Sequence, residues 1–202
     1  FKAFCWSVAE ITWDDEAASS SVEGDYLRYH YGGYTAGRTY ESSTGLYVVN
    51  YTMVYYTDYE KEQELTERIR QVMDSLNLGG KTDYEKIKAV YGYICDHVTY
   101  DHSSDGGTTE NKDYGKYTAY NAMMLGTAVC QGYSSLCYRM LREAGVGGRM
   151  VPGRSPSENH IWNIVPLDGR YYNLDSTWDA NYKEGAYRYF LQNMSDFKNH
   201  IR

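Results

Sequence analysis

The sequence predicts an α+β domain that combines several helices, one of them beginning at a cysteine, with antiparallel β-strands. Three observations lead to this prediction. Residues 57–78 and 82–98 carry helix-start signals and apolar residues spaced for one helix face. A further helical segment begins at Cys130. Residues 159–179 contain two runs of strand-forming residues around an Asp-Gly turn.

The size and charge of the chain limit the classes of function. Its 202 residues, 42% apolar and 23% charged, predict one domain with a substantial core. A net charge of -7 without a basic cluster argues against nucleic acid or an anionic membrane as partner. No apolar run approaches the ~18 residues of a membrane-spanning helix. Because the chain begins at Phe1, we expect a mature or trimmed form, and the final "FLQNMSDFKNHIR" carries no closing signal.

The amino-terminal quarter divides into two parts. Residues 1–24 include the low-complexity "AASSS" and are expected to be a leader or linker. Residues 25–56 are rich in aromatic and β-branched residues with interspersed glycines, and predict two or three antiparallel strands, most strongly at 47–55. The chain holds 24 tyrosines against 4 phenylalanines, a composition that suits half-exposed sheets and clefts. Residues 57–202 are expected to form the core domain.

Two helices are expected to open this core. Thr57 with Glu60, and Thr82 with Glu85, match the spacing of a capping box. The first helix is expected to run to about Leu78 and to stop at the glycine pair that follows. The second carries an apolar stripe at helical spacing, made of Ile87, Val90, Tyr91, Ile94, Cys95 and Val98.

The four cysteines are too few for a disulfide scaffold and contain no CxxC pair. Cys95 falls in the apolar stripe, so packing is its expected role, although a single bridge to Cys5 stays open. The cysteine count therefore does not decide the cellular compartment.

Residues 101–117 form a polar loop that begins like a calcium loop. The ligand positions 1, 3, 5 and 6 are filled by Asp101, Ser103, Asp105 and Gly106. Position 12 is Lys112, where a bidentate glutamate is required. The pattern therefore favours a mobile surface loop, which near a site could act as a lid.

The stretch "GTAVCQGYSSLCYRMLREAG" predicts a helix that begins at Cys130 and ends before Gly145. Its apolar face consists of Tyr133, Leu136, Cys137, Met140 and Leu141. Free amides and the positive end of the helix dipole surround Cys130, favour a thiolate and could stabilise an oxyanion. Position alone leaves open whether Cys130 reacts or fills space, whereas Cys137, deeper in the helix, is expected to be inert.

The hairpin around residues 168–169 predicts where a base and its partner lie. A two-residue turn there places Trp162 opposite Asp175 and His160 opposite Thr177, all on one face of the ribbon. His160 and Asp175 become diagonal neighbours at ~7 Å, within reach of a hydrogen bond.

Each of these two residues taken alone is better explained as structural. Together with Cys130 they supply a nucleophile, a base and a group that orients the base. Pro166 is a caution, because proline in a strand can introduce a bulge. Trp162 and Trp178 could equally wall a cleft or belong to the core.

Three motifs resemble those of the bacterial transglutaminase-like family: "YEKIKAVYGYICDHVTYD", "GTAVCQGYSSLCYRMLREAGV" and "ENHIWNIVPLDGRYYNLDSTWD". The resemblance covers roughly residues 60–189, and C-Q-G-Y, H-x-W-N and L-D-x-T-W in this order form a specific combination. It implies the papain-like, transglutaminase-core fold, in which the cysteine helix packs on an antiparallel β-sheet. It also implies Cys130 as nucleophile, His160 as general base and acid, and Asp175 as the orienting residue.

The resemblance implies less about the other site residues. Papain relatives often use an upstream glutamine for the oxyanion. Here the corresponding region offers Tyr120 or Asn121 beside the Cys130 amide, and Gln131 could hold the loop. The amino-terminal strands resemble the extension of secreted Gram-positive relatives, which implies an extracellular or cell-surface location.

The implied chemistry is acyl transfer on a peptide bond or a glutamine carboxamide of a protein or peptide substrate. Water as acceptor gives a cysteine protease or deamidase, which we favour slightly, and a primary amine gives a transglutaminase. No cofactor or metal is expected, because no ligand cluster of convincing spacing appears. The alternative is a non-catalytic cell-surface binding module that displays its tyrosine-rich strands on a transglutaminase-like scaffold.

Overall fold

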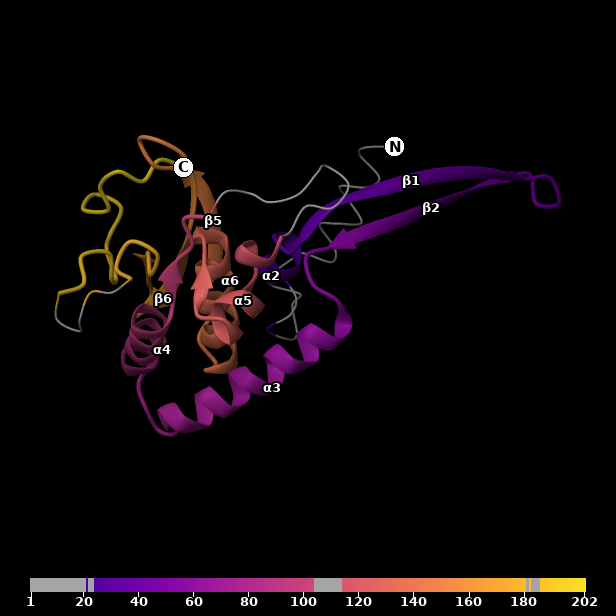
Figure 1. The fold of residues 1–202 in the computed structure, drawn as a ribbon. Coiled ribbons are helices and arrows are strands. Elements are labelled where there is room, and N and C mark those ends of the chain that lie inside the picture. The colour runs from indigo at the N-terminus through magenta and orange to yellow at the C-terminus, as the bar shows by residue number, and fades with distance from the viewer. Residues whose placement is uncertain (1–20, 22–23, 104–113, 181, 183–185) are drawn as a thin grey trace.

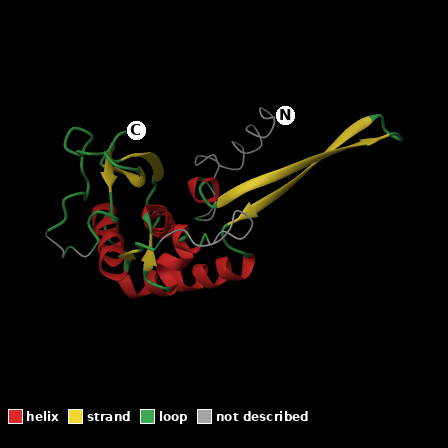
Figure 2. Cartoon of the chain, turned by 45° about the horizontal axis from the view of Figure 1, so that its top comes forward, coloured by secondary structure: helices red, strands yellow, loops and turns green. Residues whose placement is uncertain are grey.

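The computed structural model describes residues 21, 24–103, 114–180, 182 and 186–202. Helices pack beside a small sheet, and a long hairpin projects from this body (Figures 1 and 2). The sheet is antiparallel, with β6 (Asn159–Leu167) between β5 (Arg149–Arg154) and β7 (Arg170–Leu174). Helix α6 (Cys130–Glu143) lies against β6, which confirms the predicted α+β class and the cysteine helix on an antiparallel sheet.

Helices α3 (Tyr59–Leu76) and α4 (Asp83–His97) correspond to the two predicted core helices. The capping box of Thr82 and Glu85 is confirmed. The box at Thr57 is wrong, because Asp58 is the N-cap and accepts from the Lys61 amide at 2.9 Å. The Thr57 hydroxyl instead donates to Glu62 at 2.6 Å. Neither helix, nor any other in the described part of the chain, has the length and apolarity needed to cross a membrane.

The predicted stripe of α4 forms one side of the core. All its members are buried: Ile87, Val90, Tyr91, Ile94, Cys95 and Val98. Cys95 is a free thiol, and its burial raises the pKa far above the ordinary value, so its role is packing. Cys5, the other end of the bridge left open by the sequence, lies outside the described residues.

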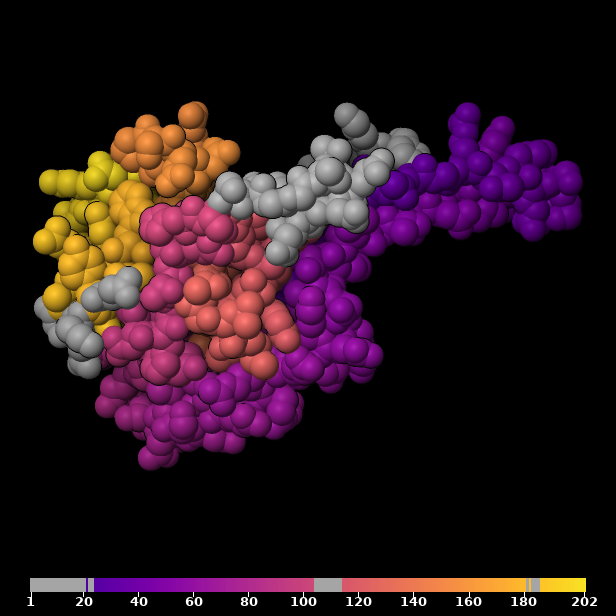
Figure 3. All heavy atoms as spheres, in the orientation of Figure 1, coloured from indigo at the N-terminus to yellow at the C-terminus, as the bar shows by residue number. Residues whose placement is uncertain are grey.

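The amino-terminal extension consists of α2 (Asp25–Arg28), β1 (Tyr31–Glu41) and β2 (Leu46–Tyr55). The two strands pair antiparallel as predicted, whereas residues 25–28 are helical. Figure 3 shows the hairpin extending well beyond the body of the molecule. Its exposed apolar side chains include Tyr40 and Tyr47, which suits a two-stranded ribbon with no sheet on either face.

Ion pairing holds the start of this extension against the core. The buried carboxylate of Asp25 accepts hydrogen bonds from Arg149 Nε at 2.8 Å and from the Met150 amide at 2.9 Å. The Tyr26 ring lies under the guanidinium of Arg139, which is itself buried and bonded to Glu62 at 3.0 Å. These contacts fix α2 beside β5 and α6.

The described part of the segment between α4 and α6 contains short helices and strands. Strands β3 (Thr99–Tyr100) and β4 (Thr127–Ala128) pair in parallel, and η1 (Gly115–Tyr117) and α5 (Ala119–Met124) lie between them in sequence. The calcium-like pattern and the expected mobile loop fall largely on residues 104–113, which lie outside the described residues.

Candidate active site

Cys130 is the first residue of α6 and is half-buried at the helix N-terminus. The N-cap residue, Val129, supplies no side-chain cap, so the helix opens with main-chain amides around the thiol. Gly132 lets this turn sit tightly against the chain before it. A Cβ there would lie 2.7 Å from the Ala128 Cβ and 2.9 Å from the Thr118 carbonyl oxygen. The glycine of the C-Q-G-Y motif is therefore required by close packing.

Two hydrogen bonds join the cysteine helix to the strand that carries His160. The Ser134 hydroxyl donates to the Ile161 carbonyl at 3.0 Å. The side-chain amide of Asn163 donates to the Ser134 carbonyl at 3.0 Å. All three groups are buried, so these bonds fix where α6 lies along β6. They thereby set the position of Cys130 relative to His160.

The register of the β6–β7 hairpin is confirmed from Leu167–Arg170 to Asn163–Leu174. The turn residues Asp168 and Gly169 have φ of 50° and 72°, as a type I′ turn needs. Pro166 introduces no bulge, since it stays paired in register.

The ladder nevertheless ends earlier than predicted. The strand β7 stops at Leu174, and Asp175 lies just beyond it. The predicted pairs Trp162–Asp175 and His160–Thr177 are therefore wrong, since neither belongs to the ladder. The Asp175 carboxylate ends the strand by accepting from the main-chain amides of Thr177 at 3.0 Å and Trp178 at 3.2 Å. On its other edge, β6 pairs with β5 from Asn159 to Ile164, and Gly153 faces His160 there.

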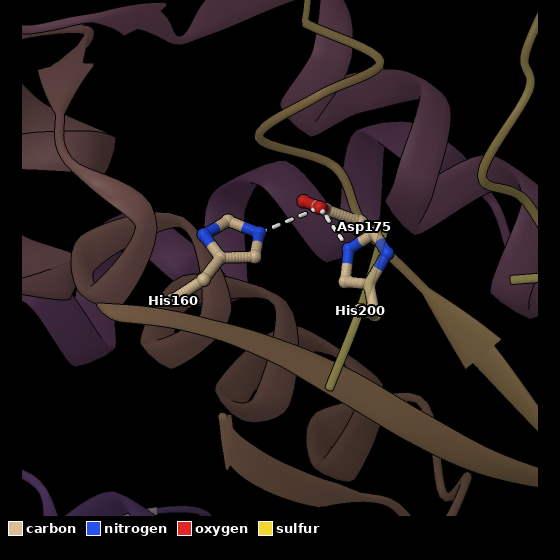
Figure 4. A group of neighbouring side chains, drawn as sticks. All are labelled: His160, Asp175 and His200. Carbon is tan, nitrogen blue, oxygen red and sulfur yellow. Dashed lines mark hydrogen bonds and ion pairs between the residues drawn. The ribbon is translucent and has the colours of Figure 1, made fainter. Parts of the chain in front are cut away.

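The structure brings His160 and Asp175 together, with Nε2 and Oδ2 2.7 Å apart and both side chains buried. In Figure 4 the other ring nitrogen of His160 points away from the carboxylate. The His160 imidazole also interacts with the Cys130 side chain. Burial would lower the pKa of His160, but the hydrogen bonds and charges of Asp175 and Cys130 outweigh burial and raise it to about 10.

Asp175 is bonded to a second histidine that sequence reasoning missed. His200 Nε2 lies 2.9 Å from the same Oδ2 atom, so the carboxylate sits between two imidazoles (Figure 4). Burial would raise the pKa of Asp175, but its bonds to both histidines outweigh burial and lower it. His200 lies 25 positions after Asp175 in an irregular segment. No periodicity or turn signal in the sequence could place it there.

His160, Asp175 and His200 are also the group of described residues whose spacing could hold a metal ion, with ligand atoms within 4.8 Å of one another. Ligands of one zinc ion at 2.0–2.2 Å stand roughly 3.3 Å apart. The two nitrogens here lie 2.7 and 2.9 Å from one oxygen, which are hydrogen-bond lengths. The distances therefore fit two hydrogen bonds to Asp175 better than three ligands of one metal ion.

The two tryptophans take different places. Trp162 is fully buried, and its indole donates to Asn173 at 3.1 Å, so it belongs to the core. Trp178 is half-buried and stacks on His160 with ring centroids 5.1 Å apart and planes 21° apart. Trp178 therefore covers one face of the imidazole.

Three further residues are expected near the oxyanion or the substrate: Tyr120, Asn121 and Gln131. Each makes a hydrogen bond to a group other than the Cys130 thiol. The Tyr120 hydroxyl donates to Glu64 of α3 at 2.7 Å, which occupies it away from the thiol. Asn121 lies on α5 beside it, and its main-chain amide donates to the hydroxyl of Thr118, the N-cap of that helix, at 3.1 Å. The Gln131 side chain donates to the Tyr29 carbonyl at 2.6 Å and so ties α6 to the amino-terminal extension.

Comparison with known proteins agrees with this fold. Residues 70–176, just over half of the chain, match the model of the transglutaminase-like superfamily. The chain therefore belongs to the transglutaminase-like superfamily. A solved crystal structure of a TGase has a TM-score of 0.50 and 19% identity to this chain, covering 60% of it and 33% of the TGase chain. That likeness is one of fold.

Among curated proteins, the chain is similar to kyphoscoliosis peptidase from Homo sapiens and Mus musculus. The human protein is 32% identical over 111 residues, which are 49% of this chain and 16% of the relative. The mouse protein is 30% identical over 124 residues, 55% of this chain and 18% of the relative. The chain thus spans less than a fifth of these relatives. Both are mammalian, so a bacterial origin stays a prediction.

Proposed function

We propose that the chain is a thiol-dependent acyl-transfer enzyme with Cys130 as nucleophile, His160 as general base and acid, and Asp175 as the residue that orients His160. One observation carries this proposal. His160 interacts with Cys130 and, through Nε2, forms a 2.7 Å hydrogen bond with buried Asp175. A nucleophile, a base and an orienting carboxylate in this order are the requirement for covalent acyl transfer.

The chemistry proceeds through a thioester. With the pKa of His160 at about 10, its imidazolium persists at neutral pH and stabilises a thiolate at Cys130. The thiolate attacks the carbonyl carbon of a peptide bond or glutamine carboxamide, and His160 protonates the departing amine or ammonia. His160 then takes a proton from the incoming water or amine, which attacks the thioester carbonyl. The C–S bond breaks, the acyl group leaves, and the Cys130 thiolate and His160 imidazolium are regenerated.

The oxyanion of the intermediate would be held by main-chain amides at the start of α6, including that of Cys130. This assignment is supported by the position of the thiol on the first helical residue. We prefer it to the Tyr120 hydroxyl, which is already bonded to Glu64.

Hydrolysis is our favoured outcome, and a protein or peptide is the proposed substrate. The test is mass spectrometry of a peptide mixture incubated with the protein, with and without a primary amine. Chain scission identifies a protease, loss of ammonia a deamidase, and addition of the amine a transglutaminase. If Cys130 is intact and reduced and none of the three products forms, the proposal is contradicted. An Asp175→Asn variant should lose turnover while keeping its fold.

A non-catalytic binding module is the second candidate, and the projecting hairpin with exposed Tyr40 and Tyr47 favours it. Iodoacetamide labelling at pH 6 separates the two. Cys137 is a matched internal control, because burial raises the pKa of its thiol to about 12. Fast, selective labelling of Cys130 supports the enzyme, and equal reactivity of the two thiols supports the binding module.

We also propose an extracellular or cell-surface location for the protein, on the resemblance of residues 25–56 to the extension of secreted relatives. Fractionation of the native source, with the chain quantified in medium, surface and cell extract, tests this. Recovery in the cell extract alone would contradict it.

A further inference from the structure

We propose that His200 is an imidazolium and a positioning residue. It holds the Asp175 carboxylate in place, and the negative charge of Asp175 is shared between His200 and His160. The inference rests on the proposed roles of Cys130, His160 and Asp175 and extends them to a fourth side chain. It assigns a function to the carboxyl-terminal segment, which the three family motifs do not include.

Both ring nitrogens of His200 face oxygen atoms. Nε2 lies 2.9 Å from Asp175 Oδ2, and Nδ1 lies 3.1 Å from the Lys198 carbonyl oxygen. A carbonyl oxygen and an ionised carboxylate only accept hydrogen bonds. Both contacts are therefore hydrogen bonds only when both nitrogens carry protons, as they do in an imidazolium.

The surroundings of His200 suit a cation whose counter-ion is Asp175. Its side chain has 0% exposure, and a buried charge is tolerated only when it is paired. Among the described residues, the titratable side chains that face it are Asp175, His160 at 5.4 Å and Tyr189 at 5.6 Å between ring centroids. The other rings around it are uncharged and belong to Trp162, Trp178 and Phe197.

The carboxyl-terminal segment is held in place by main-chain pairing with β5. The Arg154 amide donates to the Ile201 carbonyl at 2.7 Å, and the Ile201 amide donates back at 2.9 Å. Gly153, which faces His160 across the ladder, leaves room for this segment. A Cβ there would collide with the Ile201 carbonyl oxygen and with the Trp162 ring. His200 is thus positioned by a bridge that requires glycine at this point.

Sharing Asp175 between two imidazoles has a chemical consequence. A second cation beside the carboxylate weakens its hold on the His160 proton and makes the neighbourhood of Cys130 more positive. Loss of the His200 charge should therefore make both the Cys130 thiol and the His160 imidazolium give up their protons at higher pH. The larger change should fall on His160, which shares an oxygen atom with His200.

The test compares two variants in the full chain. His200→Gln keeps an N–H donor toward Asp175 without the charge, and His200→Phe keeps the ring packing without donor or charge. The control is His97→Gln, which alters an exposed histidine that stacks on Tyr93. The first measurement is the pH profile of iodoacetamide labelling at Cys130, whose two inflections report the coupled thiol and imidazole. The second is the ¹⁵N spectrum of the histidine rings, which reports the protons on each nitrogen.

We expect His200 to carry two ring protons at pH 7. We also expect both variants to move the upper inflection upward by about half a pH unit or more, while the control leaves it in place. If only His200→Phe shifts the inflection, His200 acts as a neutral hydrogen-bond donor, and the proposed positive charge on His200 is overturned. If neither variant shifts the inflection, His200 only fills space in the core, and its positioning role is overturned. If His200→Phe does not fold, the His200→Gln profile and the ring spectrum still decide.

The same labelling separates this inference from the proposed function. If wild-type Cys130 reacts no faster than Cys137, the proposed enzyme fails. If Cys130 reacts selectively but the His200 variants leave both inflections unchanged, only the role of His200 fails.

Discussion

The side-chain amide of Asn163 donates to the main-chain carbonyl of Ser134 at 3.0 Å and joins the histidine strand to the cysteine helix. Asn163 is the last residue of the H-x-W-N motif, and Ser134 lies one turn after Cys130. The motif therefore encodes more than a base. It carries its own connection to the helix that holds the proposed nucleophile.

Replacing Asn163 by Asp should damage both stability and the site. The carboxylate would face a carbonyl oxygen at a position that is 2% exposed, with no proton to donate. We expect a loss of about 1–3 kcal/mol in the free energy of unfolding in urea, and slower labelling of Cys130 at pH 6. Asn50→Asp, on the exposed hairpin, is the matched control. Equal stabilities of the two variants would show that the bond does not matter.

Gly132→Ala tests the close approach at the start of α6. The added methyl group would meet Ala128 and the Thr118 carbonyl oxygen at less than 3.0 Å. We expect a loss of about 1–3 kcal/mol in the free energy of unfolding, as for other overpacked sites. Gly79→Ala serves as control, because a Cβ there has nothing within 4 Å, and it should change stability by less than about 0.5 kcal/mol. Similar effects at both glycines would contradict the packing argument.

Gln131→Ala tests the link between α6 and the amino-terminal extension. The variant loses the 2.6 Å hydrogen bond to the Tyr29 carbonyl, a bond that contributes about 0.5–1.5 kcal/mol. Local opening of residues 25–56 should therefore become more frequent, and limited proteolysis within that segment should be faster. Gln71→Ala, an exposed change on α3, is the control. Unchanged cleavage of the Gln131 variant would mean that other contacts hold the extension.

In a Cys130→Ser protein, stability should fall as the pH rises from 7 to 8.5. The folded-state pKa of His160 is raised to about 10 from an ordinary value of 6.5, so the folded protein retains a proton that the unfolded chain releases. The resulting stabilisation is complete below pH 6.5 and is lost as the pH approaches 10. The Cys130→Ser change removes a thiolate whose loss of a proton on folding would cancel this slope, while the hydrogen bond and charge of Asp175 still raise the pKa of His160. The buried thiols of Cys95 and Cys137 contribute only toward the upper end of this range, because an unfolded thiol has a pKa of about 8.5.

Urea unfolding of the Cys130→Ser protein at several pH values measures this slope, and adding His160→Gln should flatten it. On the acid side the sign reverses. The pKa of Asp175 is lowered in the folded state, so its stabilisation is present above the unfolded value of 3.8 and is lost as the pH falls through the folded value. A double variant with the same slope as its Cys130→Ser parent between pH 7 and 8.5 would contradict the assignment of this slope to His160.

Local signals predicted much of the fold correctly. The Thr82 capping box, the apolar stripe of α4, the cysteine helix and the Asp-Gly hairpin all depend on residues within a few positions of one another. The Thr57 box failed because a neighbouring Asp58 capped the helix while Glu62 took the threonine hydroxyl. Propensity could not rank these two options, because the choice depends on the buried contacts of Glu62.

By itself, the sequence determined which side chains stand at the start of the cysteine helix and along the hairpin, because helix and strand periods are set by local geometry. Only the tertiary structure decided what surrounds them. It ended β7 before Asp175, turned the Tyr120 hydroxyl toward α3, and placed His200 on the other side of the same carboxylate. These are contacts between segments far apart in the chain, and packing and burial of charge select them rather than local spacing.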